Sequence, residues 1–231
     1  MLNNTNPLRI GAVLFPSLTA LDLFGPLQAL NVLSNQHAMT LSLLSTDLEP
    51  ISIDRTIIHG VYQGQPDRPS PFFTQFILPT HSFDDAPRFD VILVPGGGGT
   101  RDFNRTQPHV DFLTTQMQDP ELSYMMTVCT GSSLLARTGQ IAGKNATTNK
   151  GAFNWVKTVE HADEVNWIAE ARWVVDGNVW TSSGVSAGTD MILGWIEHMY
   201  GKNESERIRI GMEWNAMGQG DDPFAELAGL V

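Results

Sequence analysis

The sequence contains a single cysteine, Cys129, whose neighbours indicate a nucleophile. An apolar run at 124–128 precedes it, and the segment 130–139 has a helix-like composition that closes with glycine. A side chain at such a strand-to-helix elbow lies near the positive end of the helix dipole. A thiolate is stabilised there, so we expect a lowered cysteine pKa. The alternative is an inert cysteine packed as a small buried hydrophobic residue. The position at the elbow favours the functional thiol.

A carboxylate, Asp22, lies in the otherwise apolar stretch 20–24. One interpretation is a helix cap, in which a carboxylate oxygen accepts a backbone N–H. The other is a side chain that projects into the site, where partial desolvation raises its pKa and suits it to proton transfer. Taken alone, the sequence favours the cap.

Four consecutive glycines follow a predicted strand at positions 96–99. They are compatible with a phosphate cradle, an oxyanion hole or a plain turn. The Lys-Ser/Thr pair of a P-loop does not follow them, and no Gly-x-Gly-x-x-Gly pattern opens a helix, so nucleotide-binding motifs are excluded. An oxyanion hole fits better, with the N–H groups of Gly97, Gly98 and Thr130 facing the charge that develops beside Cys129. A tight turn remains the alternative.

Alternating apolar and helix-like segments predict the elements that position these residues. Strands are expected at 9–15, 39–46, 90–94 and 124–128, with a β-hairpin at 171–181. Helices are expected at 21–33, 108–118, 130–139, 151–161, 186–200 and 204–214. The proline-broken stretch 47–90 predicts a small antiparallel excursion with a strand at 74–78. The alternation predicts an α/β fold with a mostly parallel sheet and helices on both faces. We expect one domain over 1–231, with a core at about 8–201 and a C-terminal helix and loosely packed tail in 202–231.

The bulk composition restricts partners and compartment. A formal net charge of -11 argues against a nucleic-acid partner. We expect no secretory signal and no membrane span, and the unpaired cysteine favours a cytoplasmic location. No cluster of His, Cys, Asp or Glu has metal-ligand spacing, so we predict no metal. The histidines assigned to loops or the surface are His59, His81, His109 and His161.

The assembled pattern resembles the ThiJ/PfpI superfamily, and within it the isocyanide hydratases. The matching blocks follow the family's order along most of the chain: 10–15, 21–26, 90–97, 127–131, 146–148 and 183–190. The resemblance implies a flavodoxin-like three-layer α/β/α sandwich with a nucleophile elbow. It also implies a small-molecule substrate that reacts without a cofactor, and a homodimer. The only support for the dimer from the sequence itself is the pair of apolar residues Trp195 and Ile196, which must pack against something.

The same resemblance implies a role for each candidate residue. Cys129 would attack the terminal carbon of an isocyanide, and Asp22 would activate water and shuttle protons until an N-formamide is released. Thr130 would help to place the water or the adduct, and the Gly97 amide would line the site. Val185 would form a pocket wall in a turn that continues into Ser186.

Three positions depart from patterns in the superfamily. Thr130 and Asp22 replace the histidine and glutamate of proteases and glyoxalase-like members, which argues against the protease, deglycase and glyoxalase interpretations. A glyoxalase-type enzyme acting on reactive aldehydes stays an alternative. Asn149, followed by Lys150, stands where bacterial hydratases have histidine, so it is a candidate determinant of pocket shape and substrate. A redox-sensing or stress-protective thiol, in which Cys129 is oxidised rather than turned over, is the alternative from another functional class.

Overall fold

The structure is a computed structural model, and it describes residues 7–55 and 72–231. Its centre is a seven-stranded sheet in the order β10-β11-β7-β6-β1-β2-β5, parallel except at β10. The strands of this sheet are β1 (Leu8–Val13), β2 (Met39–Ser45), β5 (His81–Ser82), β6 (Val91–Val94), β7 (Tyr124–Val128), β10 (Trp173–Asp176) and β11 (Val179–Ser182).

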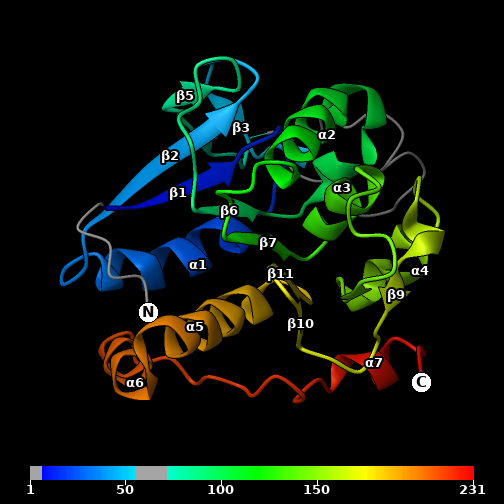
Figure 1. Cartoon of the computed structure of the whole chain (residues 1–231). Coiled ribbons are helices and arrows are strands. Elements are labelled where there is room, and N and C mark those ends of the chain that lie inside the picture. The colour runs from blue at the N-terminus through cyan, green and yellow to red at the C-terminus, as the bar shows by residue number, and fades with distance from the viewer. Residues whose placement is uncertain (1–6, 56–71) are drawn as a thin grey trace.

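Helices cover both faces of the sheet, which confirms the three-layer α/β/α prediction (Figure 1). One face carries α1 (Ala20–Leu33), α5 (Ser186–Tyr200) and α6 (Lys202–Gly211). The other carries α2 (Phe103–Met117) and α3 (Gly131–Arg137). Because both faces are covered, central strands such as β6 are buried at every position, as the continuous apolar runs predicted.

Shorter elements complete the described chain. β3 (Ile51–Ser52) and β4 (Phe76–Ile77) form the antiparallel excursion that the proline-rich stretch predicted. The others are β8 (Asn145–Ala146) with β9 (Asn166–Trp167), α4 (Phe153–Val156), α7 (Phe224–Leu227) and the 3-10 turns η2 (Gly98–Arg101), η3 (Lys150–Ala152) and η4 (Ala162–Glu164).

Two helix predictions are wrong in their limits. The helix α2 begins at Phe103, ahead of Pro108, because the Asp102 side chain accepts a hydrogen bond from the N–H of Arg105 at 3.1 Å and caps the helix there. The helix expected at 151–161 is reduced to α4, and His161 has a left-handed φ of 59° that no α-helix accommodates. The tail is mostly exposed as expected, yet Ala225 is buried, so part of it is packed.

The parallel register brings the loops after several strands to one edge of the sheet. β6 pairs with β1 on one side and with β7 on the other, so the chain leaves all three at the same end. Ligands bind at this carboxyl edge in open α/β sheets. The glycine run after β6 and Cys129 after β7 are therefore neighbours.

The elbow depends on a glycine at position 131, where α3 passes close to the end of β6. A Cβ added to Gly131 would lie 2.4 Å from the carbonyl oxygen of Val94 and 2.7 Å from that of Pro95. We expect Gly131→Ala to lower the free energy of unfolding by about 2–3 kcal/mol, since backbone must shift to admit the methyl group. Urea denaturation would measure this. Gly211→Ala, where no atom lies within 4 Å of the added carbon, is the control and should change stability far less.

Candidate active site

Cys129 lies in a sharp turn between β7 and α3. Its φ is 58°, in the left-handed region that residues with a side chain rarely adopt. Its amide N–H donates to the carbonyl oxygens of Ser182 and Ser183, both at 3.1 Å, which ties the turn to the end of β11. The predicted elbow is present, and the neighbouring strand holds its strained backbone in place.

The carboxylate of Asp22 reaches this thiol from the first turn of α1, where it is completely buried. Its Oδ2 accepts a hydrogen bond from the N–H of Gly96 at 3.1 Å, and the carboxylate also accepts one from the thiol of Cys129. No side chain caps this helix at Thr19. The cap interpretation of Asp22 is therefore wrong, because its carboxylate bonds to the glycine loop and the thiol.

Burial controls the protonation of both groups. Desolvation raises the pKa of Asp22 to about 7, although the hydrogen bonds from Gly96 and Cys129 lower it in part. Desolvation, and then the negative charge of Asp22, raise the pKa of the Cys129 thiol to about 12. The expectation of a lowered cysteine pKa is therefore wrong. The backbone N–H groups of the elbow face the sulfur, but burial and the carboxylate outweigh them.

At neutral pH the sulfur keeps its proton, and the carboxylate beside it is partly ionised. Ionised Asp22 is then a base in hydrogen-bond contact with the proton that must leave. Proton transfer and bond formation at sulfur can proceed together, so no stable thiolate is required. The pair has the arrangement of a nucleophile with its own general base.

The glycine loop is closed by Thr130. The N–H of Gly97 donates to Thr130 Oγ1 at 2.9 Å, and this hydroxyl donates to the carbonyl oxygen of Gly97 at 3.2 Å. The Gly97 amide, expected in an oxyanion hole, is thus already engaged, as is the Thr130 hydroxyl. Gly98 opens the 3-10 turn η2 beyond it. The loop positions the elbow, and Gly97 has a φ of 138° that favours glycine.

Two backbone N–H groups do face the sulfur of Cys129, those of Thr130 and Val185. The Thr130 amide was part of the predicted oxyanion hole, whereas Val185 was expected only as a wall. Val185 has the unusual φ of 31° and precedes the first turn of α5. Its amide is the donor that sequence reasoning missed, because no residue pattern reports the direction of a strained N–H.

A pocket of about 320 Å³ borders this site and brings together three of the predicted residues, Asn149, Val185 and Ser186. Asn149 also caps η3, since its Oδ1 accepts from the N–H of Ala152 at 3.1 Å. The remaining residues that line the pocket are Lys150, Gly151, Ser183, Gly184 and Phe224. Of these, Phe224 comes from the tail that the sequence assigned to loose packing.

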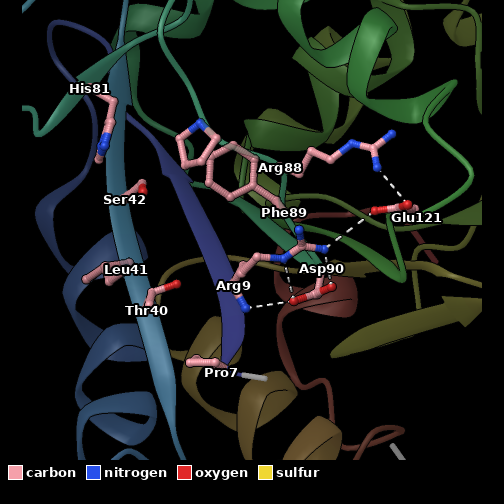
Figure 2. A pocket seen from close by; sticks show the side chains of 11 residues that line it. Pro7, Arg9, Thr40, Leu41, Ser42, His81, Arg88, Phe89, Asp90 and Glu121 are labelled. Carbon is pink, nitrogen blue, oxygen red and sulfur yellow. Dashed lines mark hydrogen bonds and ion pairs between the residues drawn. The ribbon is translucent and has the colours of Figure 1, made fainter. Parts of the chain in front are cut away.

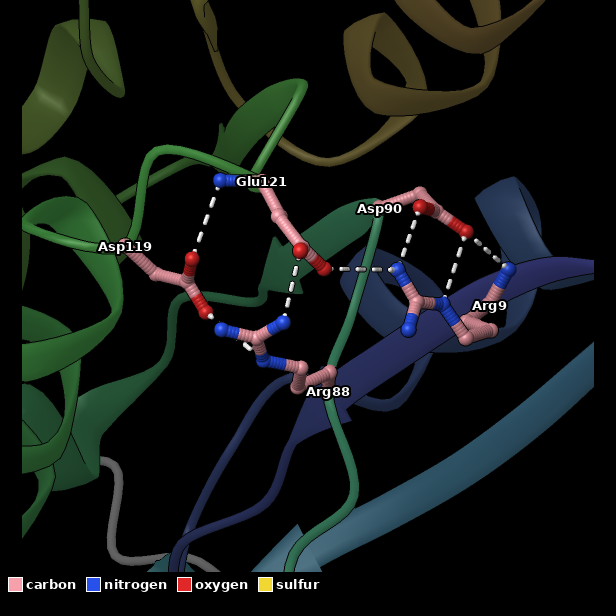
Figure 3. A network of polar contacts seen from close by, with 5 residues as sticks. All are labelled: Arg9, Arg88, Asp90, Asp119 and Glu121. Atoms are coloured by element: carbon pink, nitrogen blue, oxygen red, sulfur yellow. Dashed lines mark hydrogen bonds and ion pairs between the residues drawn. The ribbon is translucent and has the colours of Figure 1, made fainter.

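A larger pocket, of about 700 Å³, lies at the amino ends of β1 and β6, away from Cys129 (Figure 2). The Arg, Asp and Glu side chains that line it are mutually paired (Figure 3). Arg9 contacts Asp90 at 2.8 Å, Arg88 contacts Glu121 at 2.6 Å, and Glu121 also lies 3.8 Å from Arg9. Burial would raise the pKa of Asp90, but Arg9 outweighs it and the pKa is lowered. This network joins the starts of two strands.

The histidines named above were expected in loops or at the surface. His109 was assigned to the surface, but it is buried in α2 with Nε2 2.9 Å from the carbonyl oxygen of Leu14, and desolvation lowers its pKa to about 4. His59 lies outside the described residues. Within 7–55 and 72–231 no group of three or more His, Cys, Asp or Glu side chains is placed to hold a metal ion. Over the same residues, no helix is both long and apolar enough to cross a membrane.

A family model decides the relationship of this chain to known proteins. The model of the DJ-1/PfpI family matches residues 10–198, which include α1, the glycine loop and the elbow. The chain belongs to the DJ-1/PfpI family. The ThiJ/PfpI resemblance inferred from the sequence blocks is thereby confirmed.

Curated relatives within this family have different functions. The isonitrile hydratase of Pseudomonas putida is 30% identical over 90% of this chain and 78% of its own length. The HTH-type transcriptional regulator GbdR of Pseudomonas aeruginosa is 28% identical over 89% of this chain, which spans 50% of the regulator. The Parkinson disease protein 7 homolog of Danio rerio is 27% identical over 58% of this chain and 69% of its own length.

Solved structures confirm the fold. A ThiJ/PfpI family protein from Pseudomonas syringae superposes with a TM-score of 0.70 at 23% identity, covering 92% of this chain and 77% of that one. DJ-1beta of Drosophila melanogaster superposes with a TM-score of 0.68 at 19% identity, covering 90% of this chain and 99% of that one. At these identities the similarity shows the architecture alone.

Burial of Asp22 predicts a pH-dependent effect on stability. Because its folded pKa of about 7 exceeds the unfolded value of 3.8, Asp22 destabilises the folded protein progressively as pH rises from 4 to 7. Asp22→Asn removes this charge, so we expect it to raise the free energy of unfolding by up to about 4 kcal/mol above pH 7, from 1.36 kcal/mol per pKa unit. The gain should fade toward pH 4. Urea denaturation at pH 4, 6 and 8 measures this, and a gain independent of pH would contradict the assignment.

Proposed function

We propose that this protein is an isocyanide hydratase, a cofactor-independent lyase that adds water to an isocyanide and releases an N-formamide. The observation that carries the proposal is the buried contact between the Cys129 thiol and the Asp22 carboxylate, in a member of the DJ-1/PfpI family. The similarity to the isonitrile hydratase of Pseudomonas putida over most of both chains supports it.

The first half of the reaction uses the thiol and its base. Sulfur attacks the terminal carbon of R–N≡C while Asp22 accepts the thiol proton. The protonated carboxyl then returns this proton to the former isocyanide carbon, which gives the thioimidate R–N=CH–S–Cys129. A carboxyl with a pKa of about 7 suits both transfers, because neither its acid nor its base form is strongly disfavoured.

The second half adds water to the thioimidate. Asp22 takes a proton from water as the oxygen attacks carbon and passes it to nitrogen, which gives R–NH–CH(OH)–S–Cys129 and restores the carboxylate. Collapse of this adduct breaks the carbon–sulfur bond, the hydroxyl proton returns sulfur to the thiol, and R–NH–CHO leaves. The N–H groups of Thr130 and Val185 stabilise negative charge on sulfur in both halves. Oδ1 of Asp22 is buried and has no N–H or O–H partner among the described residues, so it is suited to hold the water.

The alternatives fit this geometry less well. A redox-sensing thiol needs an exposed sulfur with a low pKa, whereas Cys129 is buried and its pKa is raised. A glyoxalase-type reaction on aldehydes lacks the histidine beside the nucleophile, since Thr130 occupies that position and its hydroxyl is bound to Gly97.

The same proposal includes a small-molecule substrate, a homodimer and a cytoplasmic location for this protein. Trp195 and Ile196 do not support the dimer, because both are completely buried in the core of one chain. The dimer therefore rests on the family resemblance.

Hydration of an aryl isocyanide, followed by ultraviolet absorbance and identification of the formamide, tests the activity. We expect turnover by the wild type and complete loss in Cys129→Ala. Asp22→Asn should lower kcat/KM by about 10²–10⁴-fold, the usual contribution of a positioned base. Asp163→Asn, on an exposed carboxylate, is the matched control and should retain full activity. A wild type that is inert with a reduced thiol on several aryl and alkyl isocyanides would overturn the proposal.

The pH profile tests the role of Asp22 separately. Because the ionised carboxylate is the base, kcat/KM should rise about tenfold per pH unit below 7 and level off above the Asp22 pKa of about 7. The measurement is kcat/KM from pH 5 to 9. A profile that instead rises only above pH 8 would show that a free thiolate is the reactive form.

A further inference from the structure

The pocket beside Cys129 has one wall from the far end of the chain. Phe224, the first residue of α7, lines it together with Asn149 and Val185, which lie much earlier in the sequence. Phe224 is half exposed, so one part of its side chain meets the pocket and another meets solvent. An aromatic side chain in this position limits what the pocket can contain.

A buried ion pair fixes the segment that carries Phe224. Lys150 Nζ lies 2.9 Å from Asp222 Oδ2, and the two side chains are only 4% and 2% exposed. The same ammonium donates to Thr147 Oγ1 and to the carbonyl oxygen of Ala171, both at 2.8 Å. The ammonium thus has two hydrogen-bond acceptors and a paired opposite charge, so it is not left uncompensated in the interior. The pair ties the tail to the loop that carries Asn149.

A second set of bonds from Arg172 holds the opposite wall. Its backbone N–H donates to the carbonyl oxygen of Gln219 at 2.9 Å. Its guanidinium bonds to Asp190 at 2.6 Å and to Ser186 Oγ at 3.1 Å, and Ser186 lines the pocket. The C-terminal segment is therefore attached near the pocket by one buried ion pair, Lys150–Asp222, and by one backbone hydrogen bond, from Arg172 to Gln219.

The pocket adjoins the turn at Val185 that faces the reacting sulfur, and Cys129 itself is not one of the lining residues. Val185 directs its N–H at the thiol and also lines the pocket, and Ser183, another lining residue, accepts the N–H of Cys129. A carbon atom bonded to the sulfur would extend its remaining substituent past this turn. A volume of about 320 Å³ is at the lower end of the range for small-molecule sites.

We propose that Phe224 is a specificity-determining residue that limits the size of the substituent on the molecule attacked by Cys129, and that the Lys150–Asp222 ion pair positions it. The identity of the substrate as an isocyanide rests on the proposed function. The steric statement applies to any electrophile that reacts with Cys129, so it can be tested without isocyanide turnover.

The single cysteine provides that test. Iodoacetamide and the far bulkier N-(1-pyrenyl)iodoacetamide both alkylate a thiol. The carbon–sulfur bond forms as the carbon–iodine bond breaks, iodide leaves, and the thiol proton passes through Asp22 to the buffer. Second-order rate constants at pH 8, followed by intact-protein mass spectrometry, give a ratio of bulky to small reagent for each variant. A change in the reactivity of the sulfur itself alters both rate constants by the same factor, so it cancels in this ratio.

We expect Phe224→Ala to raise the ratio at least about tenfold, in line with the discrimination that a pocket wall provides, and Phe224→Trp to lower it. Leu227→Ala, in the same short helix but 79% exposed and outside the pocket, is the matched control and should leave the ratio unchanged. An unchanged ratio in both Phe224 variants would overturn the proposal.

The ion pair is tested with the double variant Lys150→Met/Asp222→Leu, which removes both charges and avoids leaving one of them buried alone. With folding checked by circular dichroism, we expect the ratio to rise as in Phe224→Ala while the iodoacetamide rate stays within about twofold. A folded double variant with the wild-type ratio would refute the positioning role.

The two proposals fail separately. If the wild type hydrates no isocyanide but Phe224 controls the alkylation ratio, the hydratase proposal fails and the steric role of Phe224 stands. If the wild type hydrates isocyanides but neither Phe224 variant changes the ratio, the hydratase proposal stands and the steric role fails.

Discussion

The burial of a carboxyl group against a thiol is the constraint on which the rest of this structure depends. Asp22 and Cys129 share a hydrogen bond in a space that almost no solvent reaches, and each is harder to ionise there than in water. Neither group could ionise in that space without backbone donors, because a buried charge that lacks hydrogen bonds is strongly unfavourable. The N–H groups of Gly96, Thr130 and Val185 supply them. The site is therefore made of backbone as much as of side chains.

Supplying these donors requires chain conformations that are unfavourable elsewhere. Cys129 and Val185 both have positive φ angles, and Gly97 adopts a φ that suits only glycine. Strain of this kind persists only where surrounding structure enforces it. Here the carbonyl oxygens at the end of β11 hold the elbow, and the Thr130 hydroxyl holds the glycine loop. The sheet provides the rigidity, and the loops at its carboxyl edge carry the strain.

Charged groups stabilise the fold at two places that differ in function. At the amino ends of the strands, Arg9 and Asp90 pair across β1 and β6, and Glu121 also lies close to Arg9. Near the site, the buried pair Lys150–Asp222 attaches the C-terminal segment, and the buried pair Arg172–Asp190 joins the residue before β10 to α5. Relatives of this chain include a hydratase, a regulator and DJ-1 proteins, so the scaffold alone does not specify an activity. The activity depends instead on the residues around the sulfur of Cys129.

The sequence by itself determined the order of strands and helices, the parallel sheet and the location of the site. It could do so because apolar runs and glycine turns are local signals, and because parallel strands all end at one edge of the sheet. It also predicted, through the family resemblance, that Cys129 and Asp22 act together, and the structure brings the two side chains into contact. It placed helix limits less well before Pro108, where the Asp102 side chain caps α2, and after Gly151, where α4 ends at Val156.

Only the tertiary structure decided what these residues do to one another. Four predictions considered a residue together with its sequence neighbours alone, and all four were wrong. They were the cap formed by Asp22, the lowered pKa of Cys129, the free amide of Gly97 and the exposed His109. The real partners are distant in the chain: Gly96 for Asp22, Thr130 for Gly97, and Asp222 for Lys150. Desolvation and hydrogen-bond direction depend on what surrounds a group in space. No local pattern contains that information, so the chemistry of the pair and the wall formed by Phe224 emerged only from the folded chain.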